Sequence, residues 1–267
     1  MKWFHVVALT GLVVGSALPT TASASGEGEA RRPLVVVDPG HGGTNVGAPG
    51  VDGRVYEKQV NLVLARSLAR ELEARGVRVA LTRDEDAYLS LRRRIARANE
   101  LDADAFVSIH ANATGTGARR GYETFILTPR GVDVEARAIR REGRSRPGVE
   151  ANLWPLLDDI ERGRAVPRAA ELASAIQEAL REVRGEDGDR GVRQAAFDVL
   201  MGASMPAVLV EVGFLDHPVE GLELLDPQVR RAIATAIADA VAGPQGVNAP
   251  QPQAFADVAG FELASAR

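Results

Sequence analysis

The sequence of 267 residues contains no cysteine. Disulfides, thiolate metal sites and cysteine nucleophiles are therefore excluded, and any transition-metal site must use histidine, aspartate or glutamate. Lysine is almost absent too, because Lys2 and Lys58 are the only lysines and every other basic residue is arginine. The formal net charge is −4 and the pI is about 5.7. The overall charge thus gives no support to nucleic-acid binding.

A largely apolar stretch over residues 3–18 follows Lys2 and precedes the small residues Ala22-Ser23-Ala24. This order of basic start, apolar run and small-residue cleavage site predicts a secretory signal peptide over residues 1–24. A membrane anchor is the alternative, but the run is shorter than the roughly 20 residues that span a bilayer. We therefore expect an exported protein of the bacterial periplasm or cell envelope, with no membrane span after cleavage.

The rest of the chain alternates between predicted strands and predicted helices. Strands are predicted from apolar, β-branched runs or two-residue alternation over residues 34–37, 77–81, 105–109, 121–127, 197–201 and 207–212. Helices are predicted from apolar spacing and capping residues over 58–75, 90–99, 167–183 and 227–242. The pattern favours a single α/β domain over residues 33–242, with a mostly parallel, mixed sheet and helices on both faces. Residues 243–267 are expected to form a flexible tail.

Chemically capable side chains stand at or just beyond the ends of three predicted strands. These are His41, His110 and Glu211, and sites in such sheets form at the carboxyl ends of the strands. Glu57 lies between the glycine-rich loop around His41 and the first long helix. Two imidazoles and one carboxylate form a sound zinc ligand set that leaves a position for water. Either histidine alone could equally be an ordinary, satisfied polar residue.

Glu211 follows a run of four apolar residues, so its carboxylate ends a buried strand. A carboxylate in that position is costly unless it is paired, protonated or functional. One interpretation is a general base that takes a proton from an activated water. The other is a buried salt bridge to one of the many arginines.

Other polar motifs have structural interpretations. The segment Arg83–Asp86 is predicted to form a turn with local ion pairs, and Arg92-Arg93-Arg94 a solvated helix face. His217 precedes a proline and is predicted to be structural. Ser108 and Ser204 have no defensible base nearby in the sequence pattern, which argues against a serine hydrolase.

Six ordered blocks carry a family resemblance across residues 33–242. They read VVDPGHGG (36–43), YEKQVNL (56–62), LTRD (81–84), VSIHANA (107–113), DRGV (189–192) and MPAVLVEVGFL (205–215). With these blocks the chain resembles the zinc-dependent N-acetylmuramoyl-L-alanine amidases of the amidase-3 type, the bacterial cell-separation amidases. A single block would be weak evidence for this family, whereas six blocks in the same order are specific to it.

The resemblance implies a role for each site residue. The family's Zn²⁺ ligands fall on His41, Glu57 and His110, and its catalytic glutamate falls on Glu211. The implied reaction is hydrolysis of the amide between N-acetylmuramic acid and the L-alanine of the peptidoglycan stem peptide. The implied biological role is cell-wall remodelling or daughter-cell separation.

An insertion at about residues 131–166 departs from the smallest family members. Within it, residues 149–162 are predicted to form a short amphipathic helix. In division-associated members an insertion at this place covers the zinc site until an activator protein moves it. We expect the same here, with an acidic residue near the metal, from among Glu150, Asp158, Asp159 and Glu161. A peripheral structural subdomain is the alternative.

Two other readings of the whole chain stay open from the residues alone. The ligand set permits a zinc peptidase or a deacetylase that acts on another envelope polymer, and only the ordered blocks argue otherwise. A non-catalytic wall-binding or activator protein would lack a ligand or Glu211, and all four residues are present. A monomer is expected.

Overall fold

The computed structural model describes residues 31–127 and 154–248, and side chains within the second range from residue 165 onward. The predicted signal peptide, residues 128–153, which include the first part of the insertion, and the tail from residue 249 lie outside the described residues. The account below concerns the compact unit that begins at Arg32.

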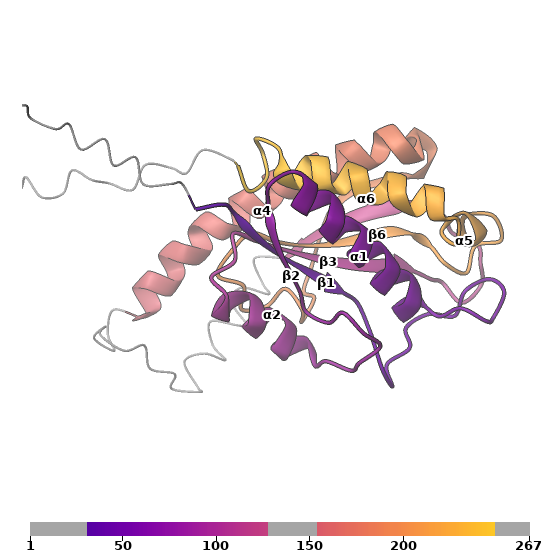
Figure 1. Cartoon of the computed structure of the whole chain (residues 1–267), viewed down its shortest axis with the longest axis horizontal. Coiled ribbons are helices and arrows are strands. Elements are labelled where there is room, and N and C mark those ends of the chain that lie inside the picture. The colour runs from indigo at the N-terminus through magenta and orange to yellow at the C-terminus, as the bar shows by residue number, and fades with distance from the viewer. Residues whose placement is uncertain (1–30, 128–153, 249–267) are drawn as a thin grey trace, which may run out of the picture. The chain divides into compact units, whose positions relative to one another are not determined.

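A six-stranded sheet forms the centre of this unit (Figure 1). The strands lie in the order β2 (Arg78–Leu81), β1 (Leu34–Pro39), β3 (Ala105–Asn112), β6 (Ala207–Phe214), β4 (Tyr122–Leu127) and β5 (Asp189–Ala195). Neighbouring strands are parallel except for β4 and β6, which are antiparallel. The predicted fold class, a mostly parallel mixed sheet in one α/β domain, is therefore confirmed.

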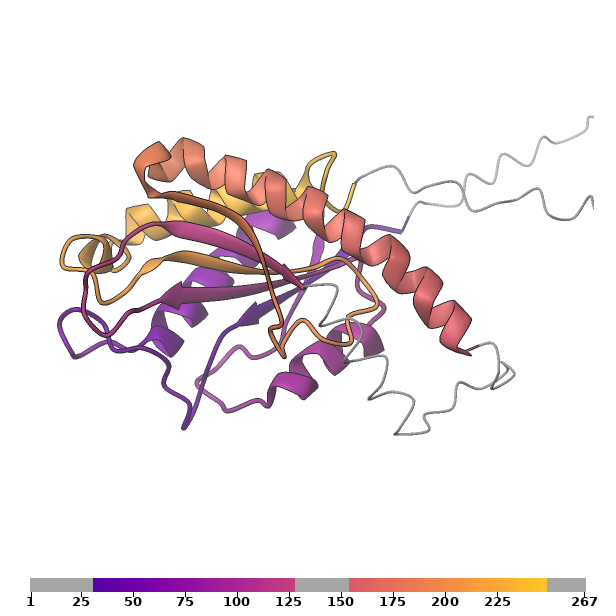
Figure 2. The ribbon, with the colours of Figure 1, turned by 180° about the vertical axis from the view of Figure 1, so that it is seen from behind.

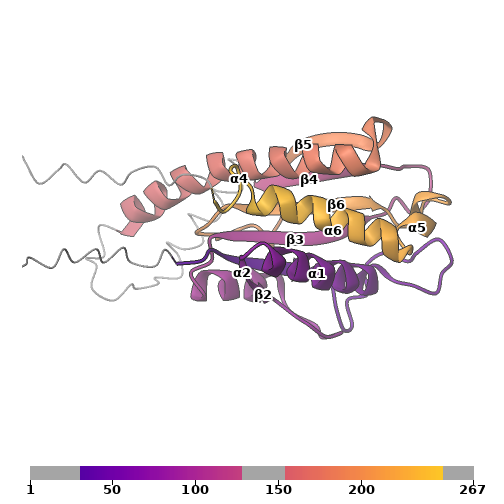
Figure 3. The same ribbon diagram turned by 45° about the horizontal axis from the view of Figure 1, so that its top comes forward.

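Helices cover both faces of the sheet, as predicted. Three lie on one face, namely α1 (Glu57–Ala74), α4 (Trp154–Arg184) and α6 (Pro227–Ala242), and α2 (Leu91–Glu100) lies on the other (Figure 3). Strand β1 is continuously apolar in sequence because both of its faces are buried. Val35 and Val37 face the larger core, while Leu34 and Val36 face the core beneath α2, because successive side chains of a strand alternate between faces.

Helix α4 differs from the prediction. It runs without interruption from Trp154 to Arg184 and includes Pro167 (Figure 2). Residues 154–162 are therefore helical, as predicted, but they belong to a long helix and not to a separate short one. The sequence signal was misread because proline is disfavoured within helices and usually marks a helix start.

One further local prediction was wrong, and two elements were missed. Residues 197–201 form a turn, not an extended segment, while β5 and the short helix α5 (Glu220–Glu223) were not predicted. The chain after α6 also stays packed for several residues, since Val247 is buried against the larger core. Within the described residues, no helix has the length and apolar character needed to cross a membrane.

Candidate active site

His41 lies in the loop that follows β1. Pro39 ends that strand, and His41 then adopts a φ of 60°, a left-handed conformation that is uncommon for a residue with a side chain. The loop approaches β3 closely, because the Gly40 N–H donates to the Ile109 carbonyl at 2.9 Å. A Cβ at Gly40 would stand 2.3 Å from the His110 ring. Glycine is therefore required where the loop passes that histidine.

Glu57 is the first residue of α1, and its carboxylate is almost fully buried. It lies at the positive end of the helix dipole, which favours a negative charge. Its Oε2 accepts the Ala48 N–H at 3.0 Å, while its Oε1 accepts the Ala111 N–H at 3.2 Å and the Asn61 amide at 3.1 Å. These bonds hold the carboxylate between the loop, the helix and β3.

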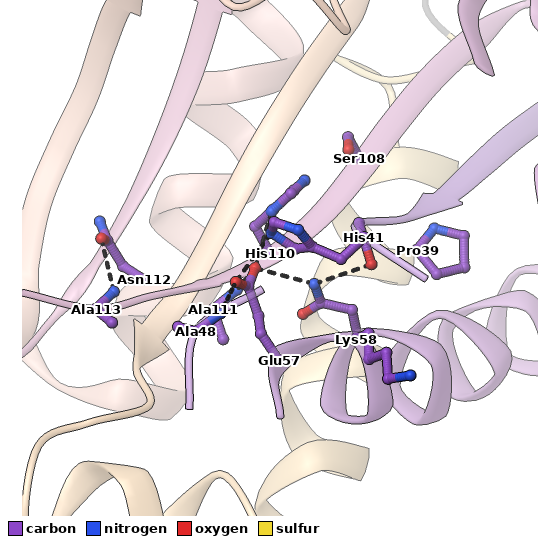
Figure 4. A network of polar contacts seen from close by, with 12 residues as sticks. Pro39, His41, Ala48, Glu57, Lys58, Ser108, His110, Ala111, Asn112 and Ala113 are labelled. Atoms are coloured by element: carbon purple, nitrogen blue, oxygen red, sulfur yellow. Dashed lines mark hydrogen bonds and ion pairs between the residues drawn. The ribbon is translucent and has the colours of Figure 1, made fainter. Parts of the chain in front are cut away.

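The three predicted metal ligands come together. His41 Nε2 lies 3.0 Å from Glu57 Oε2, and His110 Nδ1 lies 2.9 Å from Glu57 Oε1. Figure 4 shows the three side chains pointing toward one another from the loop, α1 and β3. One ligand atom from each lies within 4.8 Å of the others. Two imidazoles and a carboxylate at this spacing fit a divalent zinc-type ion.

The outer contacts select which nitrogens face the cluster. His41 Nδ1 lies 2.8 Å from the Asn45 side-chain oxygen, so Nδ1–H donates to Asn45 and Nε2 is the nitrogen that faces Glu57. On His110 the inward atom is Nδ1. The two rings meet edge-on, with centroids 5.0 Å apart.

Strong electrostatic coupling holds the cluster together. Burial alone would raise the pKa of Glu57, but its hydrogen bonds to His110 and His41 outweigh burial and hold that pKa far below its usual range. Burial opposes the charged form of His110, whereas the bond to Glu57 and the nearby carboxylates raise its pKa. The site thus favours a cation between its ligand atoms, which is what a metal supplies.

Glu211 lies next to this cluster on β6, where it is the register partner of His110 on β3. Its Oε2 is buried and has no hydrogen-bond partner among the described residues. Burial, reinforced by the carboxylates of Glu57 and Glu123 and opposed by His110, raises the pKa of Glu211 to about 7. No arginine of the described residues forms an ion pair with Glu211, so the salt-bridge interpretation is not supported and the general-base interpretation remains.

Two arginines hold the loop that carries His41, and the sequence analysis misread both. Arg94 is buried, donates to Asp38 Oδ1 at 2.8 Å and to the carbonyls of Pro39 and His41 at 2.7 Å each. The prediction of a solvated face for residues 92–94 is therefore wrong at this position. Arg83 is also buried, and its Nη2 donates to the Gly40 carbonyl at 2.7 Å. Arg83 thus bonds to a distant loop as well as within its own turn.

A second buried carboxylate beside Glu211 was missed. Glu123 on β4 is paired with Arg190 and Arg193 of β5, at 3.1 and 2.8 Å. Its other oxygen accepts the Asn112 amide at 3.1 Å. The available signal was the DRGV block at 189–192, which the resemblance included without a role.

The structural interpretation of His217 is confirmed, since its Nδ1 accepts the N–H groups of Val219 and Glu220. Ser108 is buried and donates to Asp38, which leaves it no role as a nucleophile.

The sheet and the His–Glu–His cluster define the class of protein: an α/β domain with a candidate metal centre at the carboxyl edge of its parallel strands. Comparison with known proteins identifies the family. Residues 35–243 match the family model described as Amidase_3, N-acetylmuramoyl-L-alanine amidase. The chain belongs to this family of amidohydrolases, and the predicted family is confirmed.

Similar proteins of known sequence are also named as amidases of this kind. The chain is 34% identical to the amidase AmiC of Neisseria meningitidis, over 79% of this chain and 52% of that protein. It is 34% identical to AmiA of Escherichia coli, over 78% and 74% of the two chains. The alignment thus spans only about half of the first relative.

Among solved structures, the catalytic domain of CwlV from Paenibacillus polymyxa matches with a TM-score of 0.55 at 30% identity, over 78% of this chain and 96% of that domain. AmiC2 of Nostoc punctiforme matches with a TM-score of 0.58 at 31% identity, over 78% and 94%.

Proposed function

We propose that this chain is a zinc-dependent amidase that cleaves the bond between N-acetylmuramic acid and the L-alanine of the peptidoglycan stem peptide. The observation that carries the proposal is the convergence of His41, Glu57 and His110 beside Glu211. Family membership supports the amide as the bond that is cleaved.

His41, Glu57 and His110 would hold the zinc ion. When bound, zinc supplies Lewis-acid chemistry, since it polarises the amide carbonyl and lowers the pKa of a nearby water. Glu211 accepts the proton of the attacking water at Oε2, the buried atom that lacks a hydrogen-bond partner within the described part of the chain. It then returns the proton to the leaving α-amine of L-alanine, which completes hydrolysis without an acyl-enzyme.

The test is a digest of purified peptidoglycan, with products identified by mass spectrometry. We expect free stem peptides that begin at L-alanine, loss of activity with a chelator, and recovery with zinc. Glu211→Gln should bind zinc normally but release no peptides. Zinc binding without peptide release, both by the wild-type chain and by a variant that lacks residues 130–152, would overturn the proposed substrate.

We further propose that the protein is exported to the bacterial envelope, where it remodels the wall or separates daughter cells. The signal-peptide pattern over residues 1–24 supports export. Fractionation of cells that express the full chain should place the mature protein, shortened by about 24 residues, outside the inner membrane. An uncleaved, cytosolic product would contradict this.

For the insertion at about 131–166 we propose an autoinhibitory role that an activator protein relieves. Leu127, the last described residue before it, and Ala165 near its end both line one small apolar cavity with Ala207, which begins β6. Glu211 lies four residues further along that strand, roughly 13 Å away. Covering the metal would therefore require the insertion to reach along the sheet.

The test deletes residues 130–152 and bridges the gap with a short glycine-serine linker, which leaves all of α4 in place. An autoinhibitory insertion predicts higher basal peptidoglycan hydrolysis by the deletion protein. Equal activity from a folded deletion protein would favour a peripheral structural subdomain.

A further inference from the structure

Four side chains follow one another in a single row across the sheet, from the carboxyl end of β3 to the amino end of β5. His110 on β3 is the register partner of Glu211 on β6, and Glu211 is the register partner of Glu123 on β4. Direct partners on neighbouring strands point to the same face. The last member is Arg190 on β5, whose Nε donates to Glu123 Oε2. The row therefore leads from the candidate metal centre to an arginine.

An irregularity in β5 places Arg190 in the row. Tyr122 pairs with Asp189 and Thr124 with Val192, so both Arg190 and Gly191 lie opposite Glu123. Gly191 has a φ of 78°, and its N–H donates to the Asp189 side chain at 2.8 Å. Bulges of this kind re-aim a side chain and are common beside active sites.

The Arg190 guanidinium is fixed in orientation but still has hydrogen-bond donors that are not used. Its guanidinium lies 5.3 Å from the centroid of the Phe214 ring, and its Nε is bound to Glu123 at 3.1 Å. Neither Nη group has a hydrogen-bond partner among the residues that the structure describes, and the side chain is 24% exposed. The two Nη groups thus form an oriented, accessible pair of donors.

The local charge favours an anion. Glu123 is the one carboxylate bound by both Arg190 and Arg193, so this trio carries a net charge of +1. The planar guanidinium fork binds carboxylates in two-point geometry, and it does so best when another contact already fixes its orientation.

We propose that Arg190 binds a carboxylate of the stem peptide, on the leaving-amine side of the scissile bond. The proposal rests on the proposed amidase function. Two strand intervals separate Glu211 from β5, which is roughly 10 Å at about 4.8 Å each. An extended peptide covers that distance in about three residues. The carboxylate therefore belongs to the second or third residue of the stem peptide, and Arg190 determines specificity without touching the reacting bond.

The experiment compares two soluble substrates that differ in one group. One is a muramoyl-L-alanyl-D-glutamate whose D-glutamate α-carboxylate is free, and the other carries the same position as an amide. The zinc-loaded full chain is assayed as wild type, Arg190→Ala, Arg190→Gln and Arg119→Ala. Arg190→Gln retains a donor toward Glu123, and Arg119→Ala removes an exposed arginine from the preceding loop.

We expect the wild type to prefer the free carboxylate by about tenfold in kcat/KM, as one charge-assisted contact provides. Both Arg190 variants should lose that preference through a higher KM for the acid, so that their kcat/KM values for the two substrates become equal. Arg119→Ala should behave as wild type. Binding of the two product peptides to zinc-loaded Glu211→Gln should show the same difference without catalysis.

An equal loss on both substrates would mean that Arg190 only supports Glu123, and this would overturn the proposal. Efficient hydrolysis of both substrates by the wild type, with no preference, would also overturn it while leaving the amidase function intact. Failure of both the wild type and the variant that lacks residues 130–152 to hydrolyse either substrate or peptidoglycan would instead overturn the amidase function itself.

Discussion

Glu123 and Glu211 are direct cross-strand partners on the antiparallel pair β4 and β6. Two like charges in that relation destabilise a sheet. The two carboxylates are compensated unequally, because Glu123 is neutralised by Arg190 and Arg193, while a buried oxygen of Glu211 has no partner among the described residues. The unfavourable electrostatic energy of burying two adjacent carboxylates therefore falls mainly on Glu211, the residue proposed as general base.

This concentration predicts a pH-dependent stability of the metal-free protein. The pKa of Glu211 rises from 4.5 to about 7 on folding, chiefly through burial. A raised carboxyl pKa means that its stability contribution is complete below about pH 4.5 and is lost as the pH rises through about 7. Glu211→Gln cannot ionise, so it should exceed the wild type by up to about 3 kcal/mol above pH 7.5.

Urea unfolding of both proteins in chelator, at several pH values between 4.5 and 8, measures this difference. The gap should close toward the acid end of the series. A gap of constant size across the series would show that Glu211 is not protonated at neutral pH in the metal-free fold.

The buried pair of Asp38 and Arg94 yields the second prediction. Arg94→Ala leaves the buried Asp38 carboxylate without its ion-pair partner and frees the His41 carbonyl of the loop. Loss of one partner of such a pair costs about 3–5 kcal/mol. The matched control is Arg93→Ala, because Arg93 is 62% exposed and pairs with exposed Glu100. That variant should stay within about 0.5 kcal/mol of wild type in urea unfolding. Equal costs for both variants would contradict the role assigned to Arg94.

Arg94 also shows where sequence reasoning fails. Three consecutive arginines on a helix look alike in sequence, yet only the position that faces β1 meets Asp38. Helical spacing predicts which residues share a face of the helix. It does not predict that a carboxylate from a distant strand packs against that face. The strands that bury apolar residues on both sides, β1, β3 and β6, were predictable because their sequences admit no other environment.

The candidate site also divides into residues that the sequence could place and residues that depend on contacts between distant strands. His41, His110 and Glu211 were placed correctly because parallel strands bring their carboxyl ends to one edge. Strand β5 was missed because its residues are mostly polar and none of them is buried. Its sequence therefore lacks the apolar signal of a strand. The roles of Arg190 and Glu123 then stayed hidden, since both depend on how β5 pairs with β4.

The third prediction concerns Asn45, which fixes the proton of His41 at Nδ1. Asn45→Ala removes this acceptor, so the His41 ring can reorient and zinc affinity should fall by about 10- to 100-fold. Asn45→Asp restores an acceptor and should retain most of the affinity. Chelator competition measures the zinc Kd of the three proteins. Unchanged affinity in Asn45→Ala would show that the ring is held by its other neighbours.

Gly40 gives the last prediction, because it tests the fit of the loop against His110 without invoking any polar contact. A Cβ at Gly40 would stand 2.3 Å from two atoms of the His110 ring, so Gly40→Ala must displace either the loop or that ring. Ligand geometry then fails, and zinc affinity should fall by at least about tenfold. Gly53→Ala is the matched control, since its Cβ would meet nothing within 4 Å and its φ of 65° adds only backbone strain. That strain should cost about 1 kcal/mol in urea unfolding and leave zinc affinity unchanged. If Gly40→Ala bound zinc as tightly as Gly53→Ala, the loop could shift freely, and the close packing of Gly40 on His110 would not be what sets the metal site.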